Sequence, residues 1–322
     1  LLVYFSSWFK CHEPACFLAA MLNAQPLGFY TPSQLVQDAQ RHGVEVRPVD
    51  VVASDWDCTL EAPGLAREDG EPATGEGNAL QPAVRLGLRM VDSLTGEGAG
   101  RLVAARAQAP FADVEDLALR AALDRRDMAA LAAADALASL AGHRRQQVWA
   151  ATGTRRASGL LQEAPIHEDL LRLPVAGEGE DIVFDYAATG LTLRRHPLAL
   201  LRPRLDALGW RSAAHLNTLA DGRLARACGL VSLRQRPGTA KGVMFVTLED
   251  ESGTVNVIVW PALLEELRDV FLRAQLLAVS GTWQRDASSG HRVRHLVARR
   301  AEDLTPLLGR LAGQGRGSRD FH

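Results

Sequence analysis

The stretch that decides the fold contains residues 243–249, VMFVTLE, and 255–260, VNVIVW. In the first run Met244, Val246 and Leu248 alternate with other side chains, as expected of a strand that buries one face. Three further runs also predict strands: residues 224–233, 275–285 and 291–299. The two quoted runs are therefore the second and third of five predicted strands.

Residues 261–271, between the third and fourth predicted strands, place their apolar side chains at helical spacing. Five strands with a helix between the third and the fourth are the order of an OB-fold, a small β-barrel that often binds single-stranded nucleic acid. Its predicted extent is 222–300. An RNA-binding OB module, such as an anticodon-binding domain, would share this barrel but would leave residues 1–60 unexplained.

A basic loop follows the first predicted strand, where such loops border the binding face. Residues 222–300 hold 12 Lys and Arg against 7 Asp and Glu, a net charge of +5, whereas the whole chain has a net charge of -2. A locally basic surface favours phosphate contacts. We predict DNA contacts for the basic side chains of this loop and of the last two strands: Arg234, Arg236, Lys241, Arg285 and Arg294.

Two aromatic side chains of the barrel are candidates for stacking on bases. Phe245 lies opposite the predicted interior positions of its strand, and Trp260 ends the third strand. Aromatic side chains on such a face stack on the bases of single-stranded nucleic acid. The alternative is that both rings pack in the barrel core or against a neighbouring domain.

A second candidate for nucleic-acid binding lies in the helical region before the barrel. Short helices are predicted at residues 98–106, 114–121, 125–134 and 137–150. Residues 93–106, SLTGEGAGRLVAAR, resemble a helix-hairpin-helix, in which a glycine-rich turn exposes N–H groups that hold a phosphate. Gly96 and Gly98 would form this turn, with Arg101 and Arg106 reaching the DNA backbone. An ordinary helical linker domain is the alternative.

Residues 1–60 predict compact α/β structure, with helices ending near His12 and Asn23. The run Thr31-Pro32-Ser33-Gln34 is a capping box with proline in the first helical turn. The helix that it starts is predicted to end at Gly43, and residues 44–46 alternate like a strand. Gly- and Pro-rich stretches at 61–83 and 151–182 predict linkers.

Several function classes find no support in the sequence. Four cysteines without a CxxC pair predict reduced, buried thiols and no zinc site. Asp55 and Asp57 would share one face of a strand, but without a third carboxylate at fixed spacing they fit a turn better than a catalytic metal site. No apolar run approaches the length of a membrane span. We therefore expect no catalytic residue, no metal and no cofactor in this chain, no membrane contact and a cytoplasmic location.

Longer runs resemble one family of enzymes. The runs YFSSWFKCHEPA (4–15) and LNAQPLGFY (22–30) resemble the end of the fingers region of bacterial C-family DNA polymerase α subunits. Six further runs, together with Phe245, resemble the error-prone, translesion branch: PSQLVQDA (32–39), RHGVEVRPVDV (41–51), RQRPGTAKG (234–242), TLEDE (247–251), VNVIVWP (255–261) and SRDFH (318–322).

This resemblance implies an α+β multidomain chain that forms the C-terminal part of a polymerase. The implied parts are the fingers end (1–60), a linker (61–83), a tandem helix-hairpin-helix (84–150), a linker (151–182), a helical segment (183–221), the OB-fold (222–300) and a tail (301–322). The palm with its metal-binding aspartates would precede Leu1, so Mg²⁺ is expected for the full-length polymerase and not for this part.

The resemblance also implies template-directed DNA synthesis past lesions during damage-induced mutagenesis. The implied partners are primer-template duplex, single-stranded template, mutagenesis accessory proteins and, through them, the sliding clamp. One departure from the family pattern is Ser93, which stands where the first hairpin is expected to have glycine. The competing hypothesis is a stand-alone, non-enzymatic single-stranded DNA-binding or scaffold protein built from the same modules.

Overall fold

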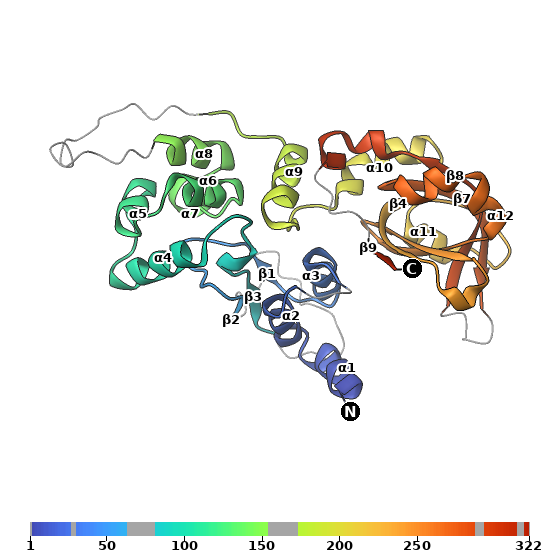
Figure 1. The fold of residues 1–322 in the computed structure, drawn as a ribbon, viewed down its shortest axis with the longest axis horizontal. Coiled ribbons are helices and arrows are strands. Elements are labelled where there is room, and N and C mark those ends of the chain that lie inside the picture. The colour runs from blue at the N-terminus through green and yellow to red at the C-terminus, as the bar shows by residue number, and fades with distance from the viewer. Residues whose placement is uncertain are drawn as a thin grey trace. The chain divides into compact units, whose positions relative to one another are not determined.

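The computed structural model describes residues 2–26, 30–62, 81–153, 173–286, 293–313 and 319–321. The chain divides into two compact units, Leu1–Leu193 and Arg194–His322, drawn in Figure 1 from blue to yellow-green and from yellow to red. The first unit is mainly helical and the second contains a closed β-barrel. This arrangement confirms the predicted fold class.

Three helices begin the first unit: α1 (Leu2–His12), α2 (Pro14–Asn23) and α3 (Pro32–Arg41). The predicted capping box is present at α3, where the Thr31 hydroxyl accepts a hydrogen bond from the Gln34 amide at 3.2 Å. The Gln34 side chain in turn accepts one from the Thr31 amide at 3.1 Å. Gly43 follows α3 with a left-handed φ of 82°, as predicted for the end of this helix.

A small sheet follows, with strand order β1-β3-β2. Its strands are β1 (Val46–Arg47), β2 (Thr59–Glu61) and β3 (Ala83–Arg85), with β1 parallel and β2 antiparallel to β3. Arg85 donates hydrogen bonds to the Glu61 carboxylate, and these bonds, together with those from Arg47, hold the pKa of Glu61 below its ordinary value. Most of the predicted linker between β2 and β3, residues 63–80, lies outside the described residues.

The helical region starts with a 3₁₀ turn, η1 (Leu88–Met90). Six helices follow: α4 (Gly96–Gln108), α5 (Val114–Arg120), α6 (Arg125–Ala133), α7 (Ala138–Ala141), α8 (Arg144–Gly153) and α9 (Glu178–Thr189). The prediction of one helix over 137–150 was wrong, because Gly142 adopts a left-handed φ of 72° between α7 and α8. Leu102, Leu117 and Leu131 are fully buried and form part of one core.

The second unit begins with α10 (Pro197–Ala207) and α11 (Ala213–Thr218). The barrel strands are β4 (Leu224–Gln235), β5 (Met244–Asp250), β6 (Gly253–Val259), β7 (Leu276–Arg285) and β8 (Arg294–Asp303). Helices α12 (Pro261–Glu266) and α13 (Arg268–Arg273) lie between the third and fourth strands. Five strands and this helical insertion confirm the predicted order.

Strand pairing closes the barrel, whose curved strands are visible in Figure 1. Four antiparallel pairs, β4–β5, β5–β6, β7–β8 and β4–β7, are completed by the parallel pair β6–β8. The interior positions predicted on β5 are confirmed, since Met244, Val246 and Leu248 are all buried. The 3₁₀ segments η2 (Gly238–Ala240) and η4 (Thr305–Gly313) flank the barrel, and β9 (Arg319–Phe321) pairs in parallel with the end of β4.

Two further findings bear on the exclusions drawn from sequence. None of the helices in the described residues is both long and apolar enough to cross a membrane. Cys58 and Cys228 are buried as predicted, and burial raises the pKa of the Cys228 thiol to about 12. Cys11 is exposed, which the prediction of buried thiols missed.

The close packing of β7 against β8 explains why residue 281 is a glycine. A Cβ atom at Gly281 would lie 1.9 Å from the Val297 carbonyl oxygen, far inside van der Waals contact. We therefore expect Gly281→Ala to lower the free energy of unfolding by about 1–3 kcal/mol. Urea denaturation followed by circular dichroism measures this loss, and hydrogen exchange in β7 and β8 peptides locates it.

Gly238→Ala is the matched control, because no atom lies within 4 Å of a Cβ built at Gly238. Equal stability of the two variants would contradict the packing argument.

Candidate nucleic-acid interface

In three turns between helical segments of the first unit, a residue other than glycine adopts a left-handed backbone conformation. Ser93, Ala122 and Asp135 have φ values of 66°, 46° and 62°. Each precedes a buried apolar residue: Leu94, Leu123 and Ala136. A left-handed conformation costs a non-glycine residue roughly 1–2 kcal/mol. The turn at Ser93 therefore forms despite the missing glycine, with the strain offset by its packing.

A carboxylate of the protein, that of Asp127, lies at the start of α4, where a bound phosphate is expected in a helix-hairpin-helix. Thr95 caps this helix through a 3.0 Å hydrogen bond from the Gly98 amide to its hydroxyl. The Asp127 carboxylate, from α6, accepts hydrogen bonds from the amide and the hydroxyl of Thr95 and is only 1% exposed. A Cβ at Gly98 would lie 2.4 Å from this carboxylate, so glycine is required there, whereas Gly96 is exposed.

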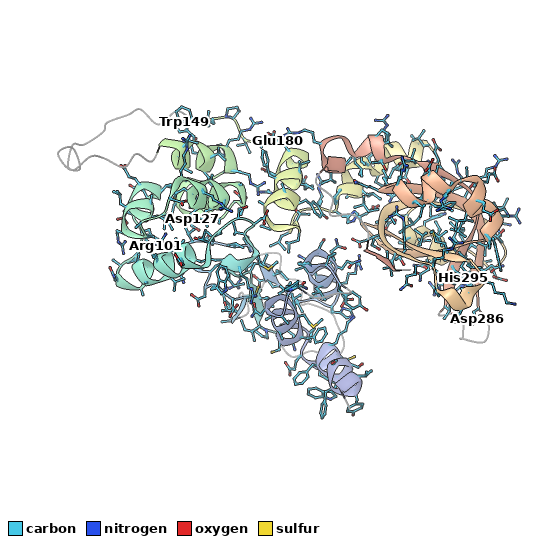
Figure 2. The ribbon with its side chains drawn as sticks, viewed as in Figure 1. Arg101, Asp127, Trp149, Glu180, Asp286 and His295 are labelled. Atoms are coloured by element: carbon cyan, nitrogen blue, oxygen red, sulfur yellow. The ribbon has the colours of Figure 1, made fainter. Side chains whose placement is uncertain are left out.

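Arg101 connects α4 to the end of α5. Its Nε donates to the Ala121 carbonyl at 3.0 Å and its Nη2 to the Ala122 carbonyl at 3.2 Å. Its Nη2 also lies 3.8 Å from the Asp127 carboxylate, and Figure 2 labels both residues. The side chain remains partly exposed, but its hydrogen bonds serve the hairpin itself. A phosphate contact by Arg101 stays a prediction.

Arg106 binds the turn that contains the two aspartates considered as metal ligands. Its guanidinium donates to the Ser54 carbonyl at 2.7 Å and to the Asp55 carboxylate at 2.6 Å. Asp57 pairs instead with Arg89 at 2.7 Å. The carboxylates of Asp55 and Asp57 are thus each paired with an arginine. The described residues contain no group of three or more potential metal ligands. The Arg106 side chain is only 18% exposed. This burial disfavours the phosphate contact predicted for it.

An apolar row crosses the outer face of the barrel. Phe245 on β5 pairs with Ile258 on β6, which pairs with Val297 on β8. Their neighbours along the strands point into the core, so these three side chains share the outer face. Phe245 is 37% exposed. Phe245 could be recognised from the sequence, whereas Ile258 and Val297 can be recognised from the same alternation only once the strands are in register.

Polar side chains lie beside this row. Thr247 on β5 donates a hydrogen bond to Asn256 on β6 at 3.2 Å. His295 on β8 lies 3.0 Å from the side-chain oxygen of Gln284 on β7. Amide, hydroxyl and imidazole groups can donate to and accept from base edges and phosphate oxygens. The outer face therefore combines an apolar platform with polar groups that suit a nucleic-acid strand.

The loop between β4 and β5 places cations beside this platform. Arg236 and Lys241 are exposed, and Lys241 has a left-handed φ of 50°. A Cβ at Gly242 would lie 3.5 Å from Pro261 and 3.7 Å from the Arg236 guanidinium. Because Trp260 immediately precedes Pro261 and is 55% exposed, the loop and this indole lie at the same end of the barrel.

Arg234 is placed differently from the prediction. Its side chain is 6% exposed and donates to the carbonyl of Phe271 at 2.6 Å and to that of Ala274. The register of β4 against β5 shifts between Val231 and Leu233, so the alternation changes and Arg234 turns inward. We therefore leave Arg234 out of the proposed DNA-binding surface.

Arg285 on β7 pairs with Arg294 on β8, next to residues 287–292, which lie outside the described residues. Arg285 is half-buried, and its side chain donates to the Leu219 carbonyl at 3.4 Å. Arg294 is half-buried as well. Both stay predicted DNA contacts at the edge of the barrel.

Two family models match parts of the chain. A helix-hairpin-helix motif matches residues 43–147, and an OB-fold nucleic acid binding domain matches residues 225–304. Among solved structures, asparaginyl-tRNA synthetase from Pyrococcus horikoshii matches 26% of this chain and 20% of that chain at 20% identity. The TM-score of this match is 0.22.

Curated relatives match the chain over its whole length. A protein of Burkholderia pseudomallei (strain K96243) named "Error-prone DNA polymerase" is 57% identical over 100% of this chain and 28% of its own length. A protein of the same name from Ralstonia pickettii (strain 12J) is 53% identical over 100% of this chain and 29% of its own length. The chain thus spans less than a third of the length of these relatives.

Arg234 and Arg236 lie two residues apart but have different surroundings, which can be tested. Arg234→Met would leave the carbonyls of Phe271 and Ala274 without their buried donor, at a cost of about 1–3 kcal/mol for each group. Arg236→Met, which removes the same charge from an exposed position, should change the free energy of unfolding by less than about 0.5 kcal/mol. Chemical denaturation of both variants measures the difference, and equal stabilities would refute the buried placement of Arg234.

Proposed function

We propose that this chain is the DNA-holding part of an error-prone DNA polymerase. The chain matches proteins of that name along its whole length, and this match confirms the family recognised from sequence. The observation that carries this proposal is the outer face of the barrel. An apolar row ending at Phe245 lies beside polar side chains and next to a loop with two exposed cations.

On this face, single-stranded DNA is the ligand that fits best. Phe245 and Trp260 offer rings for stacking, which contributes roughly 1–3 kcal/mol per base without reading sequence. Arg236 and Lys241 supply charge for the phosphates that follow the stacked bases. A single-stranded template entering a polymerase has unstacked bases, and this surface suits them better than it suits a closed duplex.

Duplex DNA is proposed to contact the helical hairpins, with the turn at Ala122 before α6 favoured over the turn at Ser93 before α4. At the start of α4, Glu97 and the buried Asp127 carboxylate place negative charge where a phosphate would bind. The start of α6 also carries two carboxylates, Asp127 and the capping Asp124, but Arg125 and Arg126 are exposed between them. The two exposed arginines of α6 offset these carboxylates and can reach a phosphate, whereas Arg101, near the start of α4, already donates to carbonyls of the hairpin.

The activity of the whole polymerase is proposed from its relatives. We infer template-directed DNA synthesis past lesions, with Mg²⁺ and the catalytic carboxylates supplied by parts of the polymerase outside this chain. Mutagenesis accessory proteins, and through them the sliding clamp, are the proposed protein partners, and the proposed location is the cytoplasm.

Fluorescence anisotropy across a salt series tests the proposal, with labelled oligothymidylate and a labelled hairpin duplex as probes. Combining Arg236→Ala with Lys241→Ala should weaken oligothymidylate binding and reduce the log–log salt slope by about 1.4, at about 0.7 for each phosphate that is no longer neutralised. Phe245→Ala should weaken the same binding about 5- to 150-fold with little change in slope, because it removes stacking and not charge.

Arg268→Ala with Arg273→Ala is the matched control, since it removes the same charge from exposed positions on α13. Arg125→Ala with Arg126→Ala should weaken duplex binding and leave oligothymidylate binding unchanged. A folded wild-type chain that binds neither probe at low salt would overturn the proposal for this chain.

A further inference from the structure

The apolar row on the outer face of the barrel continues onto β7 and β4. Val297, its member on β8, pairs with Thr282 on β7, which pairs with Leu224 on β4. Leu224 is 74% exposed, and Thr282 and Val297 are half-buried. One row of neighbouring positions therefore crosses all five strands, from Phe245 to Leu224, and the contacts with DNA proposed above use only its first half.

A second row, directly beside this one, carries arginines. Arg226 on β4 pairs with Ser280 on β7, which pairs with Arg300 on β8. The two arginines are exposed and Ser280 is half-buried. Because Ala225 and Ala227 are buried in the core on either side of Arg226, its side chain points outward. The outer face of β4, β7 and β8 thus has cations beside an open, partly apolar row.

A β-bulge in β8 adds a third cation. The register of β8 against β7 shifts beside Ser280, so Ala298 and Arg300 are paired and Arg299 between them is the extra residue. In a regular strand two successive side chains point to opposite faces. Here Ala298 is buried, but Arg299 and Arg300 are both exposed. The bulge therefore places two adjacent arginines at the surface. Together with Arg226 they form the arginine face.

The guanidinium of Arg226 is held in place by an aromatic ring. It lies 4.1 Å from the centre of the Trp210 ring, and Trp210 itself is only 6% exposed. Stacking uses the flat side of a guanidinium and leaves N–H groups at its edge for an acceptor. The Arg211 amide also donates to the Arg226 carbonyl at 2.9 Å, which fixes the main chain. A cation held in this way loses little conformational freedom when it binds a phosphate.

The charge of the arginine face favours a chain of phosphates. Within the described residues, no ion pair joins Arg226, Arg299 or Arg300 to a carboxylate. Glu302 lies in the next row along β8, opposite Ala278, and offsets one of the three charges. The remaining positive charge attracts a polyanion. Because Arg226 and Arg300 lie two strand spacings apart, about 10 Å, a single phosphate cannot contact both, whereas successive phosphates of one nucleic-acid strand can.

We propose that the single-stranded DNA bound at Phe245 continues across β8 and β7 to β4, with the arginine face holding its phosphates. Its bases pack over Val297 and Leu224, while separate phosphates contact Arg300 and Arg226. A single strand can follow the curved barrel, whereas a duplex is too stiff to do so over this distance. This path rests on the proposed function, because it extends the same bound strand, and it makes the binding site longer than the platform alone.

Oligothymidylates of about 5 and about 12 nucleotides separate the two halves of the path, since OB-folds cover about 4–16 nucleotides. Combining Arg226→Met with Arg300→Met removes two charges and keeps the apolar stems of both side chains. This double variant should lower the log–log salt slope of the longer probe by about 1.4, at about 0.7 for each phosphate. Its affinity should fall about 25-fold at about 0.1 M salt and approach that of the unchanged chain near 1 M. Fluorescence anisotropy should show no change for the shorter probe.

Two further variants separate phosphate binding from a structural role. Arg226→Lys with Arg300→Lys should restore most of the lost slope, because lysine keeps the charge. Arg268→Met with Arg273→Met is the matched control, since it removes two charges from exposed positions on α13 and should leave both probes unaffected. Circular dichroism first establishes that each variant is folded.

The shorter probe distinguishes failure of this path from failure of the proposed function. If Arg226→Met with Arg300→Met weakens neither probe, or both equally, the extended path is wrong while the platform stands. A loss confined to a hairpin duplex probe would make the arginine face a duplex site and also overturn the path. A shorter probe that does not bind, or that Phe245→Ala leaves unaffected, would overturn the platform and with it the proposed function.

Discussion

Main-chain carbonyl groups at helix ends need hydrogen-bond donors, and in both units of this chain arginine side chains supply them. Arg101 serves the end of α5, Arg120 the end of α4 and Arg234 the end of α13. Each of these guanidinium groups reaches from a different element, so the bond that satisfies a helix end also ties that helix to its neighbour. The hairpins and the barrel with its helical insertion depend on this use of arginine.

This constraint divides the cations of the chain into two populations. The guanidinium groups that satisfy carbonyls are held by the fold, and moving one toward a phosphate would leave a carbonyl unpaired. The exposed cations, such as Arg236, Lys241, Arg125 and Arg126, carry no such obligation within the described residues. The proposed contacts with DNA therefore lie at loops, at helix starts and on the outer face of the barrel, where charge can move toward a ligand without loss of structure.

Much of the fold could be predicted because local patterns agree with the tertiary structure. Alternation along β5, the capping box at Thr31 and helical spacing after Trp260 each have a short-range physical cause. The candidate site was harder to predict, because side-chain direction depends on pairing between strands. The register shift after Val231 turned Arg234 into the protein, and no pattern in the single sequence marks that shift. Ser93 misled for a related reason, since packing of the next residue can hold a left-handed turn without glycine.

The parallel seam between β6 and β8 has a consequence for synthesis of the protein. Strands β4, β5, β6 and β7 can pair along the chain as they leave the ribosome, but the barrel stays open until β8 arrives. Until then β6 and β7 each present an unpaired edge, and the valine-rich interior faces water. Open edges of this kind recruit strands from other chains. Closure of the barrel therefore waits for the last of its five strands, and a pause in translation before β8 emerges would prolong the exposure of both edges.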